Sequence, residues 1–289
     1  NDTLTPIVFQ MPSQGLQVCR RPEAASLSRL IQHIEADLTP KSRHHVARWL
    51  MGQLAPTGGL EGAAAVLTAM PFGSFQHDIQ STMGRAVRDL CATRLASMSS
   101  IEKAPLQVVA IADCARALLR TCHSPQTELW RTCRDKLLGA LRAAAARRNH
   151  RLLAALLQLA GVGFAKEQPS ASADAAYIEL CEWLTSHLAQ STEIGAAAAA
   201  CFLAEAGKMQ FSEAASRHKA CASWIHVVRF LAANEDWAVR HLLLRGVKML
   251  MKHGELSKDQ MKQLAMPLHD EIRSFLGDQD ASRPEAVFA

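Results

Sequence analysis

Helix-length segments separated by turn-forming residues are the feature that most limits what this chain can fold into. Separators such as Pro56-Thr57-Gly58-Gly59, Pro71-Phe72-Gly73 and Asn234-Glu235-Asp236 end one segment and begin the next. Runs of β-branched residues are few, alanine is abundant and aromatic residues make up only 5% of the chain, so strand propensity is low. The sequence therefore predicts an all-α fold.

Twelve helices are expected between an extended segment at 1–22 and a tail at 277–289. Their short connections favour antiparallel neighbours. The longer break at 165–172 divides them into a first block, 23–164, and a second block, 173–276. The expected helices are 24–38, 41–55, 60–70, 75–98, 104–122, 125–148, 150–161, 173–190, 193–208, 212–233, 236–253 and 257–276.

Composition narrows the class of protein. With 49% hydrophobic and 20% charged residues, the 289-residue chain can bury a large core or a stack of small ones, which excludes general disorder. The longest apolar run, Leu152 to Ala165, is too short to cross a bilayer, so no membrane span is expected. The chain begins at Asn1 without a methionine, so we interpret this end as either processed or excised.

The cysteines suggest a reducing environment. No CxxC pair occurs, and most of the eight cysteines fall on apolar helical positions, which favours buried free thiols over disulfides or a zinc site. We therefore expect an intracellular location, in the cytoplasm or an organelle matrix. The eight are Cys19, Cys91, Cys114, Cys122, Cys133, Cys181, Cys201 and Cys221.

A small apolar residue shortly before an arginine recurs along the chain. It occurs at Val46, Val87, Cys133 and Val239, at successive intervals of 41, 46 and 106 residues. The first two intervals match the roughly 40 to 47 residues of HEAT and armadillo units. The third leaves room for two units and the break at 165–172.

The residues around Val239 carry a family resemblance. Asp236-Trp237-Ala238-Val239-Arg240, followed by Leu243 and Val247, resembles the start of the second helix of a HEAT repeat, and Ala86-Val87-Arg88-Asp89-Leu90 is similar. The segment 192–207 contains no arginine and departs from this pattern. The resemblance to HEAT and armadillo proteins implies antiparallel helix pairs stacked as a short irregular α-solenoid. An irregular helical bundle with helices of similar length is the alternative architecture.

Motifs for catalysis are missing from the sequence. It contains no HExxH, GxSxG, GxxxxGK[ST] or GxGxxG motif. The adjacent pairs His44-His45 and Cys122-His123 point to different sides of a helix, so neither pair can bind one metal ion by itself. We predict no catalytic residue, cofactor, metal ion or small-molecule substrate, and interpret the chain as a protein that is not an enzyme.

Basic residues form stripes on the outer sides of two expected helices, 125–148 and 236–253. Arg142 and Lys248 both lie nine residues after a register position, so the two stripes coincide in the repeat. If second helices line a concave face, as the resemblance implies, the stripes form a basic inner channel. The candidate basic binding face consists of Arg48, Arg131, Arg134, Arg142, His241, Arg245, Lys248 and Lys252.

These features lead to two hypotheses about function, beside a third in which the chain is an enzyme whose functional residues form no local motif. The first is a non-catalytic helical-repeat scaffold or adaptor that binds other proteins as a structural subunit of a larger assembly, because helical repeats present extended surfaces. The second is an RNA- or DNA-binding protein that uses the basic face, for example in an organellar ribonucleoprotein. The stripes lack the interleaved aromatic residues on which single-stranded bases stack, and a purely solvated charged face explains them equally well.

Overall fold

The computed structural model describes residues 39–55, 59–69, 75, 77–95, 97–121, 127–188, 193–233, 237–253 and 256–276. Twelve α-helices and one π-helical turn occur in these ranges, which contain no strand, so the all-α prediction is confirmed. The expected helix 24–38, the extended segment 1–22 and the tail 277–289 lie outside them.

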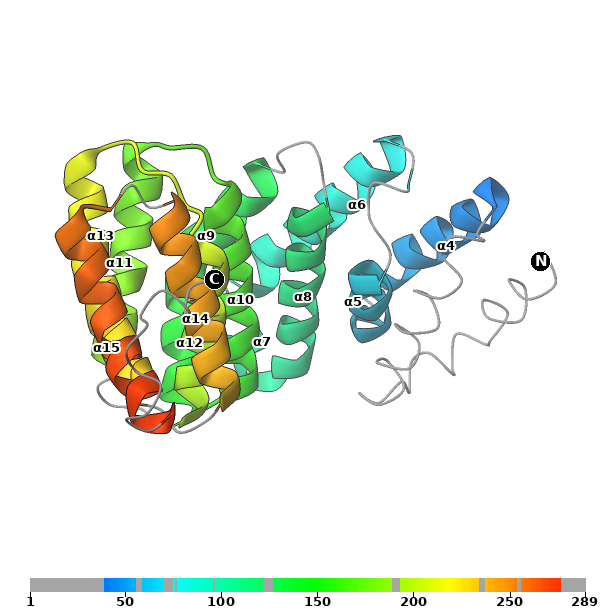
Figure 1. The fold of residues 1–289 in the computed structure, drawn as a ribbon. Coiled ribbons are helices and arrows are strands. Elements are labelled where there is room, and N and C mark those ends of the chain that lie inside the picture. Colours follow the sequence, from blue (N-terminus) through cyan, green and yellow to red (C-terminus); the bar gives the residue numbers. More distant parts are fainter. Residues whose placement is uncertain are drawn as a thin grey trace. The chain divides into compact units, whose positions relative to one another are not determined.

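The chain forms two compact units, Asn1–Arg148 and Asn149–Ala289. Unit 1 contains α4 (Pro40–Gln53), α5 (Leu60–Ala69), α6 (His77–Leu90), η3 (Cys91–Leu95), α7 (Met98–Lys103), α8 (Pro105–Thr121) and α9 (Thr127–Ala146) (Figure 1). Unit 2 contains α10 (His150–Lys166), α11 (Ala171–Leu188), α12 (Glu193–Ala206), α13 (Ala214–Ala232), α14 (Trp237–His253) and α15 (Lys258–Leu276).

Local sequence explains where α4 and α15 begin. The Thr39 side chain accepts a hydrogen bond from the backbone N–H of Ser42, and Pro40 occupies the first helical turn of α4. Before α15, the Ser257 hydroxyl accepts from the N–H of Gln260, while the Gln260 side chain accepts from the N–H of Ser257. This reciprocal capping box satisfies two backbone donors that the helix itself leaves unpaired.

The expected helix 75–98 is not a single α-helix. α6 ends at Leu90, the π-helical turn η3 follows, and a separate short helix, α7, begins at Met98. The Thr93 hydroxyl donates to the carbonyl oxygens of Asp89 and Leu90, which are the last two residues of α6. Threonine therefore competes for backbone acceptors where the helix changes its hydrogen-bonding pattern.

The division of the chain also differs from the expected one. The expected break, 165–172, lies within unit 2, where residues 167–170 connect α10 to α11. α10 belongs with the helices that follow it, because it packs along α12. The expected helix 150–161 ended at Gly161, but α10 continues to Lys166. Gly161 lies inside α10, where it allows the close contact with α12.

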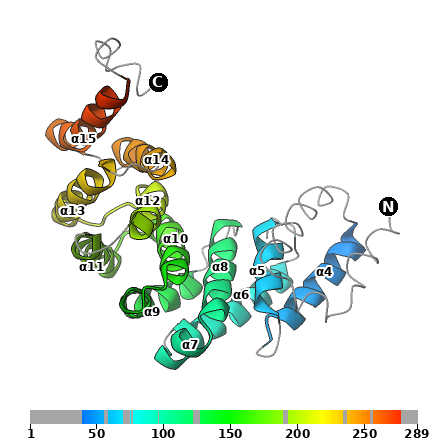
Figure 2. The ribbon, with the colours of Figure 1, turned by 90° about the horizontal axis from the view of Figure 1, so that it is seen from below.

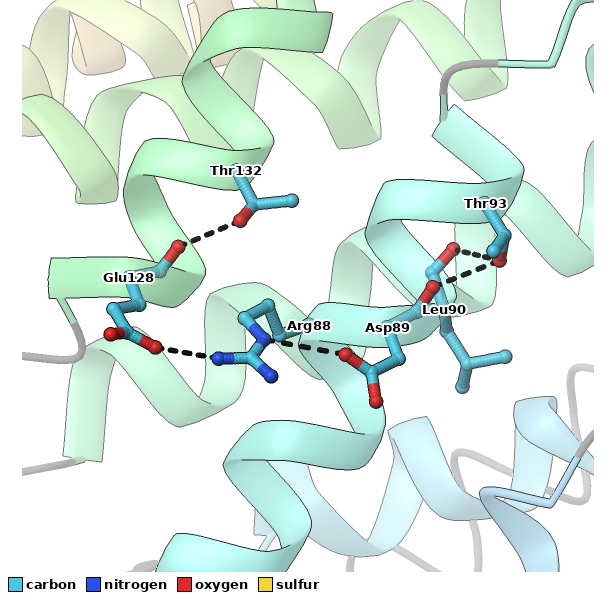
Figure 3. A network of polar contacts seen from close by, with 6 residues as sticks. All are labelled: Arg88, Asp89, Leu90, Thr93, Glu128 and Thr132. Carbon is cyan, nitrogen blue, oxygen red and sulfur yellow. Dashed lines mark hydrogen bonds and ion pairs between the residues drawn. The ribbon is translucent and has the colours of Figure 1, made fainter.

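Unit 1 is held together by apolar packing and by ion pairs at its surface. α5 packs on α8, and α6 packs with η3 against α9. At the junction of α6 and α9, the Arg88 guanidinium contacts both Asp89 and Glu128 (Figure 3). Its distance to the Glu128 carboxylate is 2.5 Å, and its distance to that of Asp89 is 3.3 Å. Arg88 thus ties the end of α6 to the beginning of α9.

Unit 2 has two rows of helices. α10, α12 and α14 pack side by side in one row, and α11, α13 and α15 in the other (Figure 2). Both an α-solenoid segment and a layered bundle contain such rows. The small residues of α12 suit its central place, since Ala199 and Ala200 are fully buried.

Glycines bring the backbones of the first row close together. A Cβ atom added to Gly161 would lie 3.0 Å from the backbone oxygen of Phe202 in α12. One added to Gly246 in α14 would lie 3.1 Å from the backbone nitrogen of Ala204. A larger residue at either position would push neighbouring helices apart.

Tyr177 and Asp174 are buried and form hydrogen bonds inside unit 2. The indole N–H of Trp224 donates to the hydroxyl of Tyr177 over 3.0 Å, and both side chains are buried. The carboxylate of Asp174, in the first turns of α11, accepts from the hydroxyl of Ser212 at 2.8 Å and from its backbone N–H at 3.1 Å. Asp174 is 1% exposed, so an ionisable group of α11 fixes the turn that leads into α13.

Candidate binding surface

Opposite sides of α14 differ in polarity. Val239, Leu243, Val247 and Leu250 form its buried side and are at most 1% exposed. The sequence folds this way because apolar residues recur every three or four positions, which places them on one face of a helix. The opposite side is exposed and carries four basic side chains, which we call the basic ridge: His241, Arg245, Lys248 and Lys252.

The basic ridge is straight. At about 100° per residue, its four positions fall within about 60° of one another around the helix. They extend over about 16 Å along the helix axis, since each residue adds about 1.5 Å. The ridge therefore offers a narrow linear array of positive charge rather than a broad patch.

Little negative charge balances the ridge within its own helix. α14 contains no aspartate or glutamate. Arg245 pairs with Glu205 of α12 at 3.6 Å and remains 51% exposed. In the described part of the chain, no acidic side chain forms an ion pair with Lys248 or Lys252. Like charges three or four residues apart destabilise a helix by about 0.2–0.5 kcal/mol per pair, so the lysine pair of the ridge, Lys248 and Lys252, disfavours the helical conformation of α14.

Four apolar side chains accompany the ridge, and sequence analysis did not identify them as part of a surface. Leu242 and Met249 lie along one edge, and Leu244 and Met251 lie along the other. All four are partly exposed. We call them the apolar shoulders. The signal for them is in the sequence, because their positions flank those of the ridge on a helical projection.

The other four predicted face residues belong to unit 1. Arg48 is exposed on α4 and donates from its guanidinium to the imidazole of His44 at 3.4 Å. Arg131 and Arg142 are exposed on α9. Arg134 differs from them, because its side chain is only 10% exposed and pairs with Asp135 at 3.5 Å. The structure thus brings together the four residues on α14, while α4 and α9 carry the rest.

The surface of α9 also differs from the ridge in charge. Asp135 and Glu128 share the exposed side of α9 with Arg131 and Arg142, so acids and bases alternate there. Two motif arginines of unit 1, Arg88 and Arg134, contact the aspartate that follows each of them. These arginines therefore act in local ion pairs, and α14 is the stronger candidate for binding a charged partner.

The four register positions are all buried. Val46, Val87 and Cys133 are 0% exposed, and Val239 is 1% exposed. Buried apolar positions fit both a repeat and a bundle, so they do not distinguish the two architectures.

The described cysteines are buried and free, as the sequence predicted: Cys91, Cys114, Cys133, Cys181 and Cys221. Cys19 and the side chains of Cys122 and Cys201 lie outside the description. A hydrogen bond with Cys133, together with burial, raises the pKa of the Cys91 thiol, and burial raises that of Cys181 to about 12. Such thiols stay protonated and behave as small apolar groups.

Among the described residues, no group of three or more His, Cys, Asp or Glu side chains is arranged to hold a metal ion. None of the described helices combines the length and the apolar character needed to span a bilayer.

Comparison with models of protein families, with curated protein sequences and with solved structures finds no match to this chain. The resemblance to HEAT and armadillo repeats therefore stays a prediction.

Proposed function

We propose that this chain is a non-catalytic helical scaffold or adaptor that binds an acidic partner protein through the basic ridge, as a structural subunit of a larger assembly. The observation that carries the proposal is the exposed face of α14, where His241, Arg245, Lys248 and Lys252 line up without an acidic residue in the helix. An array of like charge attracts a partner of opposite charge and speeds its association.

The packing of α14 supports its use as a binding element. Its apolar side is anchored on α12, and Gly246 allows the two backbones to approach closely. A helix fixed in this way holds its exposed side chains at constant spacing, so little backbone ordering is needed when a partner binds. Such a surface suits a scaffold, which must present the same contacts to each copy of its partner.

The second candidate function is binding of RNA or DNA by the same residues. It is favoured by the row of basic side chains on the ridge, because lysine and arginine bind phosphate groups without reading sequence. Partners captured from a cell extract therefore have to be compared with and without nuclease.

The experiment is a pull-down with the 289-residue chain and two double charge reversals. Lys248→Glu/Lys252→Glu reverses two charges of the ridge. Lys258→Glu/Lys262→Glu is the matched control, because it reverses two exposed lysines at the same spacing on α15 of the same unit. Circular dichroism verifies that both variants keep their helices.

We expect a defined set of proteins to be captured by the wild type and the control, to resist nuclease and to be lost from the ridge variant. Loss of the captured set on nuclease treatment would support nucleic-acid binding instead. Equal capture by all three chains would refute a role for α14.

A further inference from the structure

We infer that the occupant of the basic ridge is an amphipathic acidic helix of a partner protein that lies along α14. This inference rests on the proposed function and adds the chemistry of the partner segment. Its basis is the combination of three features at α14, namely the ridge, the two apolar shoulders and the position of Glu205.

The ridge sets the spacing of the partner's charges. His241, Arg245, Lys248 and Lys252 are separated by four, three and four residues, which is the repeat of one face of a helix. A second helix with carboxylates at the same spacing places one acid opposite each base over about 16 Å. An extended segment has a rise of about 3.3 Å per residue, so its alternate side chains fall out of step with the ridge.

The apolar shoulders determine which side chains flank the carboxylates of the partner helix. Leu242 and Met249 on one edge and Leu244 and Met251 on the other remain partly exposed beside the charges. Methionine adapts its shape to apolar neighbours and is enriched at protein interfaces. Leucine or similar residues on both sides of the partner's carboxylates would cover these shoulders, as in other complexes where a helix lies against an apolar surface.

The same features disfavour a nucleic-acid backbone. A phosphate chain carries charge at every step and no apolar side chain for the shoulders. Glu205 lies beside the ridge, where its carboxylate contacts Arg245 and repels a continuous polyanion. A peptide helix can place a neutral residue opposite Glu205. The ridge contains no Phe, Tyr or Trp, and the single imidazole ring of His241 does not form a row of aromatic side chains on which successive bases could stack.

Fluorescence anisotropy with the 289-residue chain and three labelled probes tests this inference. The first probe is a synthetic helical peptide with glutamates at positions i, i+4, i+7 and i+11, flanked on both sides by leucines. The second has the same composition in scrambled order, and the third is a single-stranded RNA oligonucleotide. Each probe is titrated at low and at physiological salt.

We expect the patterned peptide to bind at least about tenfold more tightly than the scrambled one, since both complementary charge and apolar contact depend on the pattern. Lys248→Glu/Lys252→Glu should weaken its binding by about tenfold or more, and Lys258→Glu/Lys262→Glu should not change it. Met249→Ser/Met251→Ser should weaken the binding of the patterned peptide and leave the binding of the scrambled peptide unchanged.

The outcomes separate this inference from the proposed function. Equal binding of the patterned and scrambled peptides would overturn the inference that the partner segment is an acidic helix. This holds even if the capture of proteins in the pull-down still depends on the ridge. Tight binding of RNA alone, lost in the ridge variant, would overturn it in favour of nucleic acid. If the ridge variant changes neither the capture of proteins nor the binding of any probe, the inference and the proposed function both fail.

Discussion

Replacing Asp174 with alanine is expected to detach the beginning of α13 from α11. The buried carboxylate accepts from the Ser212 hydroxyl at 2.8 Å and from the Ser212 N–H at 3.1 Å. Hydrogen bonds to a charged group contribute about 1.5–3 kcal/mol each to stability. Since Ser212 is exposed and water can replace part of what is lost, we expect Asp174→Ala to lower the free energy of unfolding by about 2–4 kcal/mol.

A double-mutant cycle separates this contact from a general effect on packing. Ser212→Ala removes the hydroxyl and keeps the backbone N–H, so it should cost about 1–2 kcal/mol. The double variant should cost less than the sum of the two single variants, with a coupling energy of about 1 kcal/mol. Urea denaturation gives these free energies, and hydrogen exchange should show faster opening of amides at the start of α13. Additive effects, or a loss below about 0.5 kcal/mol for Asp174→Ala, would refute the role of this contact.

Three further predictions concern packing and titration. Tyr177→Phe leaves the buried indole N–H of Trp224 without the tyrosine hydroxyl as its acceptor. It should lower the free energy of unfolding, measured by urea denaturation, by about 1–3 kcal/mol. A loss below about 0.5 kcal/mol would show that this hydrogen bond contributes little to stability. Gly161→Ala should lower the free energy of unfolding by about 1–3 kcal/mol, because the added methyl group meets the α12 backbone. Gly139→Ala is the control: it has open space around it and should raise the free energy of unfolding by about 0.5–1 kcal/mol. Equal shifts in Tm for the two variants would contradict the close approach of α10 and α12. Burial raises the pKa of Cys181 to about 12, so the unfolded chain loses this proton first as pH rises above about 9, and stability should fall by up to about 1.4 kcal/mol per pH unit. Cys181→Ala should make this alkaline decline shallower, and parallel profiles would show that the thiol does not contribute.

Much of the fold follows from local signals in the sequence. α8, α11, α13, α14 and α15 lie within about two residues of the expected ranges, because proline, glycine and capping residues mark helix ends in the sequence itself. The π-helical turn η3 was not predicted, since it depends on hydrogen bonding that residue types alone do not specify. Nor was the assignment of α10 to unit 2, which depends on its contact with α12.

The candidate site was predictable only in part. The basic stripe of α14 could be recognised from its spacing, because all four of its bases fall on one side of a helix whose other side is apolar. The low exposure of Arg134 could not be recognised from the sequence, because it arises from tertiary packing. The apolar shoulders were visible on a helical projection, yet only their partial exposure in the folded chain separates them from core residues.

The most direct test of binding through the basic ridge is partner capture by Lys248→Glu, measured together with the Tm of this variant. The new glutamate lies between two cations, Arg245 and Lys252, and replaces like-charge repulsion with attraction, so Tm should be equal to or higher than that of the wild type. Capture of the acidic partner should nevertheless fall by several fold, while Lys262→Glu on α15 should leave it unchanged. Undiminished capture by Lys248→Glu would contradict the claim that the basic ridge of α14 is the binding surface.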